Sequence, residues 1–83
     1  MKYLYVYAYP LQMIVIQLQE DSKIIENMNC PFNDTIGNIQ KYLNQYSDIE
    51  TIVVVGQTNY ADKMEQLVEI NFKGLVNIER INN

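Results

Sequence analysis

The segment Thr51-Ile52-Val53-Val54-Val55-Gly56 decides how this chain is organised. Its five β-branched residues follow one another without a break, so both faces of an extended segment would be apolar. A strand with one face in water alternates between apolar and polar residues. A strand that is covered on both faces, or lies in the middle of a parallel sheet, does not. β-Branched residues disfavour a helix interior, and the run is too short to span a membrane as a helix. We therefore predict a central strand here, with Gly56 permitting a tight exit.

Length and composition limit the class of protein. The chain has 83 residues, which gives room for a single domain over residues 1–83. It is 48% hydrophobic and 19% charged, as globular domains are. The net charge of −4 offers no electrostatic footprint for nucleic acid, so we do not expect a nucleic-acid partner. The N-terminal residues lack a signal-peptide cleavage pattern, so we expect a soluble, cytoplasmic protein without membrane contact.

The single cysteine and the absence of histidine exclude several kinds of site. Cys30 has no second cysteine for an internal disulfide, and a Cys/His zinc site cannot form. A cysteine nucleophile would lack its histidine base. We expect Cys30 to be a small buried hydrophobic residue, and we predict no metal and no cofactor.

Three strands are predicted before the central one. Residues Lys2–Tyr9 alternate with period two, and Leu11–Gln19 does the same after a turn at Pro10, which predicts an antiparallel hairpin. The polar turn Glu20-Asp21-Ser22 leads to a third strand over Lys23–Met28.

Two helices and a final strand complete the chain. The spacing of Ile36, Ile39 and Leu43 predicts a helix over Thr35–Tyr46, capped by Asn33 or Asp34. A second helix is predicted over Tyr60–Phe72, with Thr58 or Asn59 as its cap, Asn59 and Asp62 in a capping arrangement, and Gly74 at its C-terminal end. Val76–Ile81 has interspersed polar residues, which suits an edge strand.

The order of elements is thus β-β-β-α-β-α-β, which predicts an α/β fold with a mixed five-stranded sheet. This order, together with the segment Ile52-Val53-Val54-Val55-Gly56, resembles the ribonuclease-H-like superfamily. The resemblance implies a strand order of 3-2-1-4-5 with only the second strand antiparallel to the others. A ferredoxin-like sandwich is the rival, but it opens β-α-β. Two right-handed crossovers in the same direction place both helices on one face of the sheet, which leaves the other face without a helix.

A row of tyrosines is the most informative feature for function. Tyr3, Tyr5, Tyr7 and Tyr9 share one parity of the first strand, while Leu4, Val6 and Ala8 have the other. The aliphatic set suits the helices, so the tyrosines belong on the helix-free face. Tyrosine is enriched at protein interfaces, and we predict that this row is an interaction surface together with Met13 and Val15. The alternative is that these are ordinary half-exposed strand residues. Base stacking is not expected, since only Lys2 supplies a nearby cation.

No catalytic set can be assembled from the sequence. The family resemblance would imply an acid on the first strand and further acids later, to hold two metal ions, but the first strand has Tyr5-Val6-Tyr7-Ala8. The loop Gly56-Gln57-Thr58-Asn59 joins a strand to a helix N-terminus and is a possible anion or ligand loop, although a simple capped turn accounts for it and the P-loop pattern is absent.

These observations lead to one hypothesis and an alternative. The leading hypothesis is a small non-enzymatic protein-interaction module that presents its Tyr-rich sheet face, as a homodimer or bound to a larger protein. The residue choice, rich in Asn, Ile, Lys and Tyr, would suit an accessory protein of a phage or mobile element. The alternative is a degenerate ribonuclease-H-like domain that binds nucleic acid or a nucleotide without turnover. An enzyme in its own right has the least support.

Overall fold

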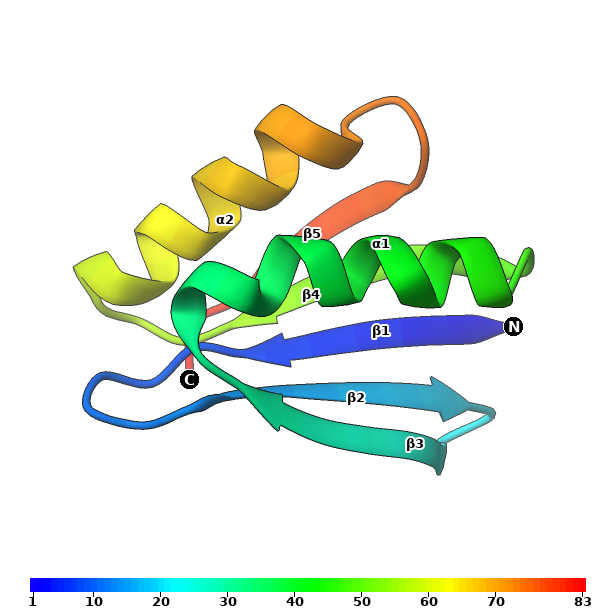
Figure 1. Ribbon diagram of the computed structural model, residues 1–83, viewed down its shortest axis with the longest axis horizontal. Coiled ribbons are helices and arrows are strands. Elements are labelled where there is room, and N and C mark those ends of the chain that lie inside the picture. Colours follow the sequence, from blue (N-terminus) through cyan, green and yellow to red (C-terminus); the bar gives the residue numbers. More distant parts are fainter.

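The computed structural model describes residues 1–83 and contains one five-stranded sheet with two helices packed against one face (Figure 1). The strands are β1 (Lys2–Tyr7), β2 (Ile14–Glu20), β3 (Lys23–Cys30), β4 (Ile49–Val55) and β5 (Asn77–Ile81). The helices are α1 (Thr35–Gln45), which a 3-10 turn, η1 (Phe32–Asp34), precedes, and α2 (Asn59–Phe72). The predicted α/β class, the order of elements and the position of both helices on one face are confirmed.

The sheet has the strand order β3-β2-β1-β4-β5. β1 pairs with β4 in parallel, β4 pairs with β5 in parallel, and β2 runs antiparallel to both of its neighbours. β4, which contains Thr51–Val55, therefore lies inside the sheet between β1 and β5. These five residues are all buried.

The main core lies between the sheet and the helices. Alternate residues of the strands face this layer. The fully buried ones in and next to β1, β2 and β4 are Leu4, Val6, Ala8, Ile14, Ile16, Leu18, Ile52 and Val54. The helices contribute Ile39 and Tyr42 from α1 and, from α2, Ala61, Met64, Val68 and Phe72. Within the predicted stripe of α1, Ile36 and Leu43 are only half-buried. Tyr42 takes their place in the core, and burial raises the pKa of its hydroxyl.

The connection between β1 and β2 differs from the prediction. A tight turn at Pro10 was expected, with a strand from Leu11 onward, but β2 begins only at Ile14. Pro10 cannot donate a ladder hydrogen bond, and Leu11 has a left-handed backbone with φ 65°, so neither residue can continue an extended pair. Leu11 is fully exposed at this loop. The hairpin is thus joined by a longer loop than the sequence indicated.

The turn between β2 and β3 follows the prediction in position. Asp21 and Ser22 have φ of 52° and 69°, as the two central residues of a type I′ turn do, and this turn matches the twist of paired strands. The register shifts between Leu18 and Gln19, so Ile25 forms a bulge in β3. β3 also continues to Cys30, beyond the predicted end at Met28, and Cys30 is buried as expected.

The N-cap positions of both helices, Asp34 and Thr58, are among the predicted ones, but neither side chain makes a capping hydrogen bond. Asp34 precedes α1 without a side-chain cap, and the Thr35 hydroxyl instead donates to the carbonyl oxygen of Pro31 at 3.3 Å. Asn59 is the first residue of α2, so the N-cap is Thr58, which makes no side-chain cap bond either. Asp62 pairs with Arg80 in place of the expected capping arrangement. Gly74 follows the C-cap residue of α2 with φ 88°, a backbone conformation that glycine favours.

Candidate interaction surface

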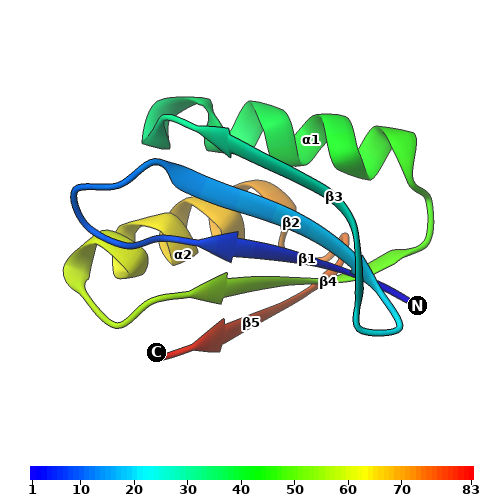
Figure 2. The ribbon, with the colours of Figure 1, turned by 90° about the horizontal axis from the view of Figure 1, so that it is seen from below.

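The sheet face opposite the helices, which we call the open face, has no helix in front of it (Figure 2). Paired residues cross this face in three rows from β3 to β5. The first row is Asn29, Val15, Tyr7, Val55 and Ile81; the second is Asn27, Gln17, Tyr5, Val53 and Glu79; the third is Ile24, Gln19, Tyr3, Thr51 and Asn77. The tyrosines form the middle column, as the parity of the sequence predicted.

The four tyrosines form a continuous ladder of nearly parallel rings. The ring centroids of Tyr3 and Tyr5 are 6.5 Å apart, those of Tyr5 and Tyr7 are 6.1 Å apart, and those of Tyr7 and Tyr9 are 6.4 Å apart. Each tyrosine is half-buried, so part of every ring remains open to solvent. The result is an aromatic strip along the full length of β1.

The tyrosine ladder also covers its neighbours in β4. Thr51, Val53 and Val55 lie on the open face beside Tyr3, Tyr5 and Tyr7, and each is only 2% exposed. No helix lies over them, so the neighbouring side chains on the same face must shield them (Figure 2). The sequence argument expected this face to have no internal cover. That expectation is wrong for β4, because large rings beside a β-branched residue can fold over it.

The rest of the open face is polar but almost free of charge. Amide side chains occupy positions on β2, β3 and β5: Gln17, Gln19, Asn27, Asn29 and Asn77. Glu79 is the only charged residue in the three rows. The Nε2 of Gln19 donates to Oε1 of Gln17 at 2.9 Å, and the Tyr7 hydroxyl donates to the same oxygen at 3.5 Å. Burial, and then the neighbouring hydroxyls of Tyr5 and Tyr9, raise the pKa of Tyr7, so its phenol stays neutral.

Exposed apolar residues stand at the rim of this face. Met13, Ile24 and Ile81 are 49%, 58% and 38% exposed. Of the predicted surface residues, Val15 pairs with Tyr7 on the open face and is half-buried, whereas Met13 lies just before β2, outside the paired residues. The amides and Ile81 were missed by sequence reasoning. Only the cross-strand register, which brings distant segments into one row, could have shown them.

A shallow hollow of about 390 Å³ lies in the open face near the β2–β3 turn. It is lined by Met1, Tyr3, Tyr5, Gln19, Asp21 and Ser22. The hollow gives one end of the tyrosine ladder a concave shape, into which a side chain of a partner can fit.

The predicted ligand loop, Gly56-Gln57-Thr58-Asn59, follows the C-terminal end of β4. Acidic side chains lie near this loop. The Nε of Arg80 donates to the carbonyl oxygen of Gly56 at 2.9 Å, and its Nη1 donates to Asp62 and Glu65 at 2.9 Å each. Desolvation lowers the pKa of Arg80, and the two carboxylates more than offset this. The guanidinium is therefore already matched by acids, and this arrangement does not favour an anion at the loop.

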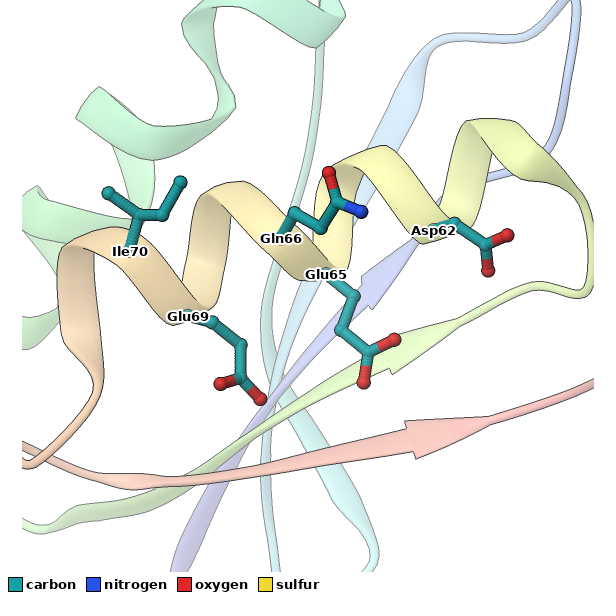
Figure 3. A pocket seen from close by; sticks show the side chains of 5 residues that line it. All are labelled: Asp62, Glu65, Gln66, Glu69 and Ile70. Carbon is teal, nitrogen blue, oxygen red and sulfur yellow. The ribbon is translucent and has the colours of Figure 1, made fainter.

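A hollow of about 520 Å³ beside α2 is lined by Asp62, Glu65, Gln66, Glu69 and Ile70 (Figure 3). Asp62 and Glu65 are held by Arg80. No group of three or more acidic or cysteine side chains in the structure could hold a metal ion.

Lys2, the other cation that forms ion pairs, is also matched by two carboxylates. Its Nζ lies 2.6 Å from Asp48 and 3.1 Å from Glu20. The hydrogen bonds that Lys2 donates to Asp48 and then to Glu20 raise the pKa of Lys2, and the bond from Lys2 lowers the pKa of Asp48. The cation nearest to the tyrosine ladder in sequence therefore faces carboxylates and adds no free positive charge to the open face.

Comparison with known proteins adds no assignment, since neither a protein-family model nor a curated protein matches this sequence. No helix in the structure is both long enough and apolar enough to cross a membrane. The open face is accordingly the feature on which a functional assignment must be built.

Proposed function

We propose that the protein is a small non-enzymatic protein-interaction module that binds another protein chain through its open face. The observation that carries this proposal is the tyrosine ladder: four half-buried rings in one uninterrupted strip on a face without a helix. Tyrosine supplies contact area with little loss of side-chain entropy, and its hydroxyl stays useful to a partner's polar groups. The partner is a second copy of the chain or a larger protein.

The electrostatics support a protein partner over nucleic acid. A platform for bases needs cations beside the aromatic rings to attract phosphates. The three rows of the open face contain no Lys or Arg, and both Lys2 and Arg80 are paired with two carboxylates each. An aromatic face with amide groups around it and a single charged residue on its edge strand is instead typical of a protein interface, whose centre is depleted of charge.

We further propose that the fold is of the ribonuclease-H-like kind, and the strand order together with the single antiparallel strand supports this. The acids that such nucleases use have no counterparts in this chain. β1 carries Tyr5 and Tyr7 where an acid would be expected, and Asp62 forms an ion pair with Arg80. The lack of these acids supports a binding role without catalytic turnover. A cytoplasmic accessory protein of a phage or mobile element fits the residue choice and is proposed on that basis alone.

Photo-crosslinking from one position on each side of the molecule tests the proposed function. A photoreactive amino acid replaces Asn27, exposed on the open face, or Gln66, exposed on α2, which provides a matched amide site away from it. Each variant is irradiated in cells of the native source, and adducts are identified by mass. We expect a discrete adduct from position 27 and none from position 66. Equal labelling from both positions, or none from position 27, would contradict the proposal.

A further inference from the structure

We infer that the partner of the open face is a second copy of this chain, bound face to face about a two-fold axis parallel to β1. This inference rests on the proposed function and specifies its partner. Charge, chemical self-complementarity and area lead to it, and the position of one carboxylate fixes the orientation.

Charge permits two copies to meet through the open face. The chain has a net charge of −4, so two copies repel each other wherever acidic side chains come together. Glu79, on the edge strand, is the only charged residue in the three rows of the open face. The α2 side, by contrast, presents Asp62, Glu65 and Glu69 together. Apposition of two open faces therefore avoids most of the repulsion.

The polar groups of the open face can form hydrogen bonds with the same groups on a second copy. A charged surface requires a partner of opposite charge, but tyrosine hydroxyls and Gln or Asn amides each donate and accept hydrogen bonds. The face combines the tyrosine ladder with amides on both sides of it, at Gln17 and Asn27 toward β3 and at Asn77 on β5. A second copy can thus satisfy these groups, and nothing on the face selects a basic or an acidic partner.

The area of the face is sufficient for a weak dimer. Five strands at a spacing of about 4.8 Å, each about 20 Å long, present a face of roughly 480 Å² in projection. Two such faces together bury roughly 1,000 Å² of accessible surface, at the lower end of specific interfaces. We therefore expect association in the micromolar range.

The position of Glu79 selects between the two ways in which the faces can meet with their strands aligned. With the two-fold axis perpendicular to the strands, each strand lies over its own copy, and Glu79 meets the partner's Glu79. With the axis parallel to β1, the middle row is reversed, so that Glu79 lies over Asn27 at the other end of that row. The first arrangement opposes two carboxylates, and the second gives each carboxylate an amide donor. The second is the arrangement we propose.

The test is a charge rescue across the interface, measured by sedimentation of purified protein over a concentration series. In Asn27→Asp, an acid faces Glu79 twice per dimer, and we expect association at least about tenfold weaker, because like charges that face each other across the interface repel. In Glu79→Lys, a lysine faces Asn27, and we expect a change of only a few-fold. The double variant places Asp and Lys opposite each other and should associate at least as tightly as the wild type.

The geometry of one chain makes this rescue specific. Asn27 and Glu79 lie on opposite edge strands, four strand spacings or about 19 Å apart, which exceeds the screening length of about 8 Å at physiological salt. An ion pair between them can therefore form only between two copies. Gln40→Glu, exposed on α1, adds the same charge away from the face and should leave association unchanged.

The outcomes separate this inference from the proposed function. A wild type that remains monomeric at its highest soluble concentration overturns the homodimer, while the adduct from position 27 still decides whether the face binds another protein. Dimers that Asn27→Asp does not weaken also overturn it. A double variant as weak as Asn27→Asp overturns the orientation about β1.

Discussion

Gly56 and Ala8 approach so closely that a Cβ atom on residue 56 would lie 2.5 Å from the carbonyl oxygen of Ala8. The same atom would lie 2.7 Å from the Cβ of Ala61 in α2, and Gly56 has φ 150°, which L side chains rarely adopt. Gly56 thus lets the end of β1, the end of β4 and the start of α2 meet at one point. The tight turn that the sequence predicted after β4 is thus also a close contact with the end of β1 and the start of α2.

We predict that Gly56→Ala destabilises the fold by about 2–4 kcal/mol, since overpacking and backbone strain each cost about 1–3 kcal/mol. Gly37 is a matched control, because a Cβ atom there meets nothing within 4 Å in the interior of α1. Gly37→Ala should stabilise the protein by about 0.5–1 kcal/mol. Urea unfolding followed by circular dichroism measures both, and equal stability of Gly56→Ala and wild type would disprove the steric argument.

We predict that β4 is the most protected strand in amide hydrogen exchange. Val54 is fully buried between β1 and β5, and its truncation to Ala should cost about 1–3 kcal/mol, interpolated from large-to-small substitutions in protein cores. The amides of Val53 and Val54 should exchange only through global unfolding. Ile24→Ala, at a side chain 58% exposed, is the control and should change stability by less than about 0.5 kcal/mol. Fast exchange at Val53 and Val54 would remove β4 from the stable centre.

We predict that Tyr5→Ser destabilises the chain by about 1–3 kcal/mol even when it is monomeric, because Val53 loses the ring that shields it. Tyr5→Phe keeps the ring and should change stability by less than about 1 kcal/mol. Unfolding at low protein concentration separates this effect from association. If the two substitutions cost the same, the ring does not protect Val53.

We predict that the ion pair between Lys2 and Asp48 makes stability depend on pH in acid. The bond from Lys2 lowers the folded-state pKa of Asp48, so the contribution of this carboxylate is fully present above its unfolded pKa of about 3.9. It is lost as the pH falls through the lower folded-state pKa. Wild type should therefore exceed Asp48→Asn in stability at neutral pH, and the two should converge in strong acid. Asp21→Asn, in the β2–β3 turn, is the control; a difference for Asp48→Asn that persists at the lowest pH would contradict this linkage.

The alternation of Tyr3, Leu4, Tyr5 and Val6 was enough to predict which side of β1 faces the helices. Side-chain parity is a local property of extended backbone, so no knowledge of distant residues is needed. The unbroken run at Thr51–Val55 likewise predicted a buried interior strand, which the structure confirms.

The shielding of Val53 could not be read from the sequence, because it depends on which residue of β1 lies beside it. That register joins segments almost fifty positions apart and is set by the whole sheet. Leu11 was misplaced for a similar reason: its left-handed backbone is imposed by the loop, whereas its side chain suits a strand. The amides of the open face have no common spacing in the sequence and become one surface only through strand pairing.

The parallel pairing of β1 with β4 joins Lys2 to Ile49 and Tyr7 to Val55. During synthesis on the ribosome, β1, β2 and β3 therefore emerge well before β4, the parallel partner of β1. Translation at about 5–20 residues per second leaves these three segments without that partner for seconds, with apolar side chains such as Leu4 and Val6 uncovered. Chaperones that bind exposed apolar segments of nascent chains would meet these segments before α1 and β4 are available to cover them.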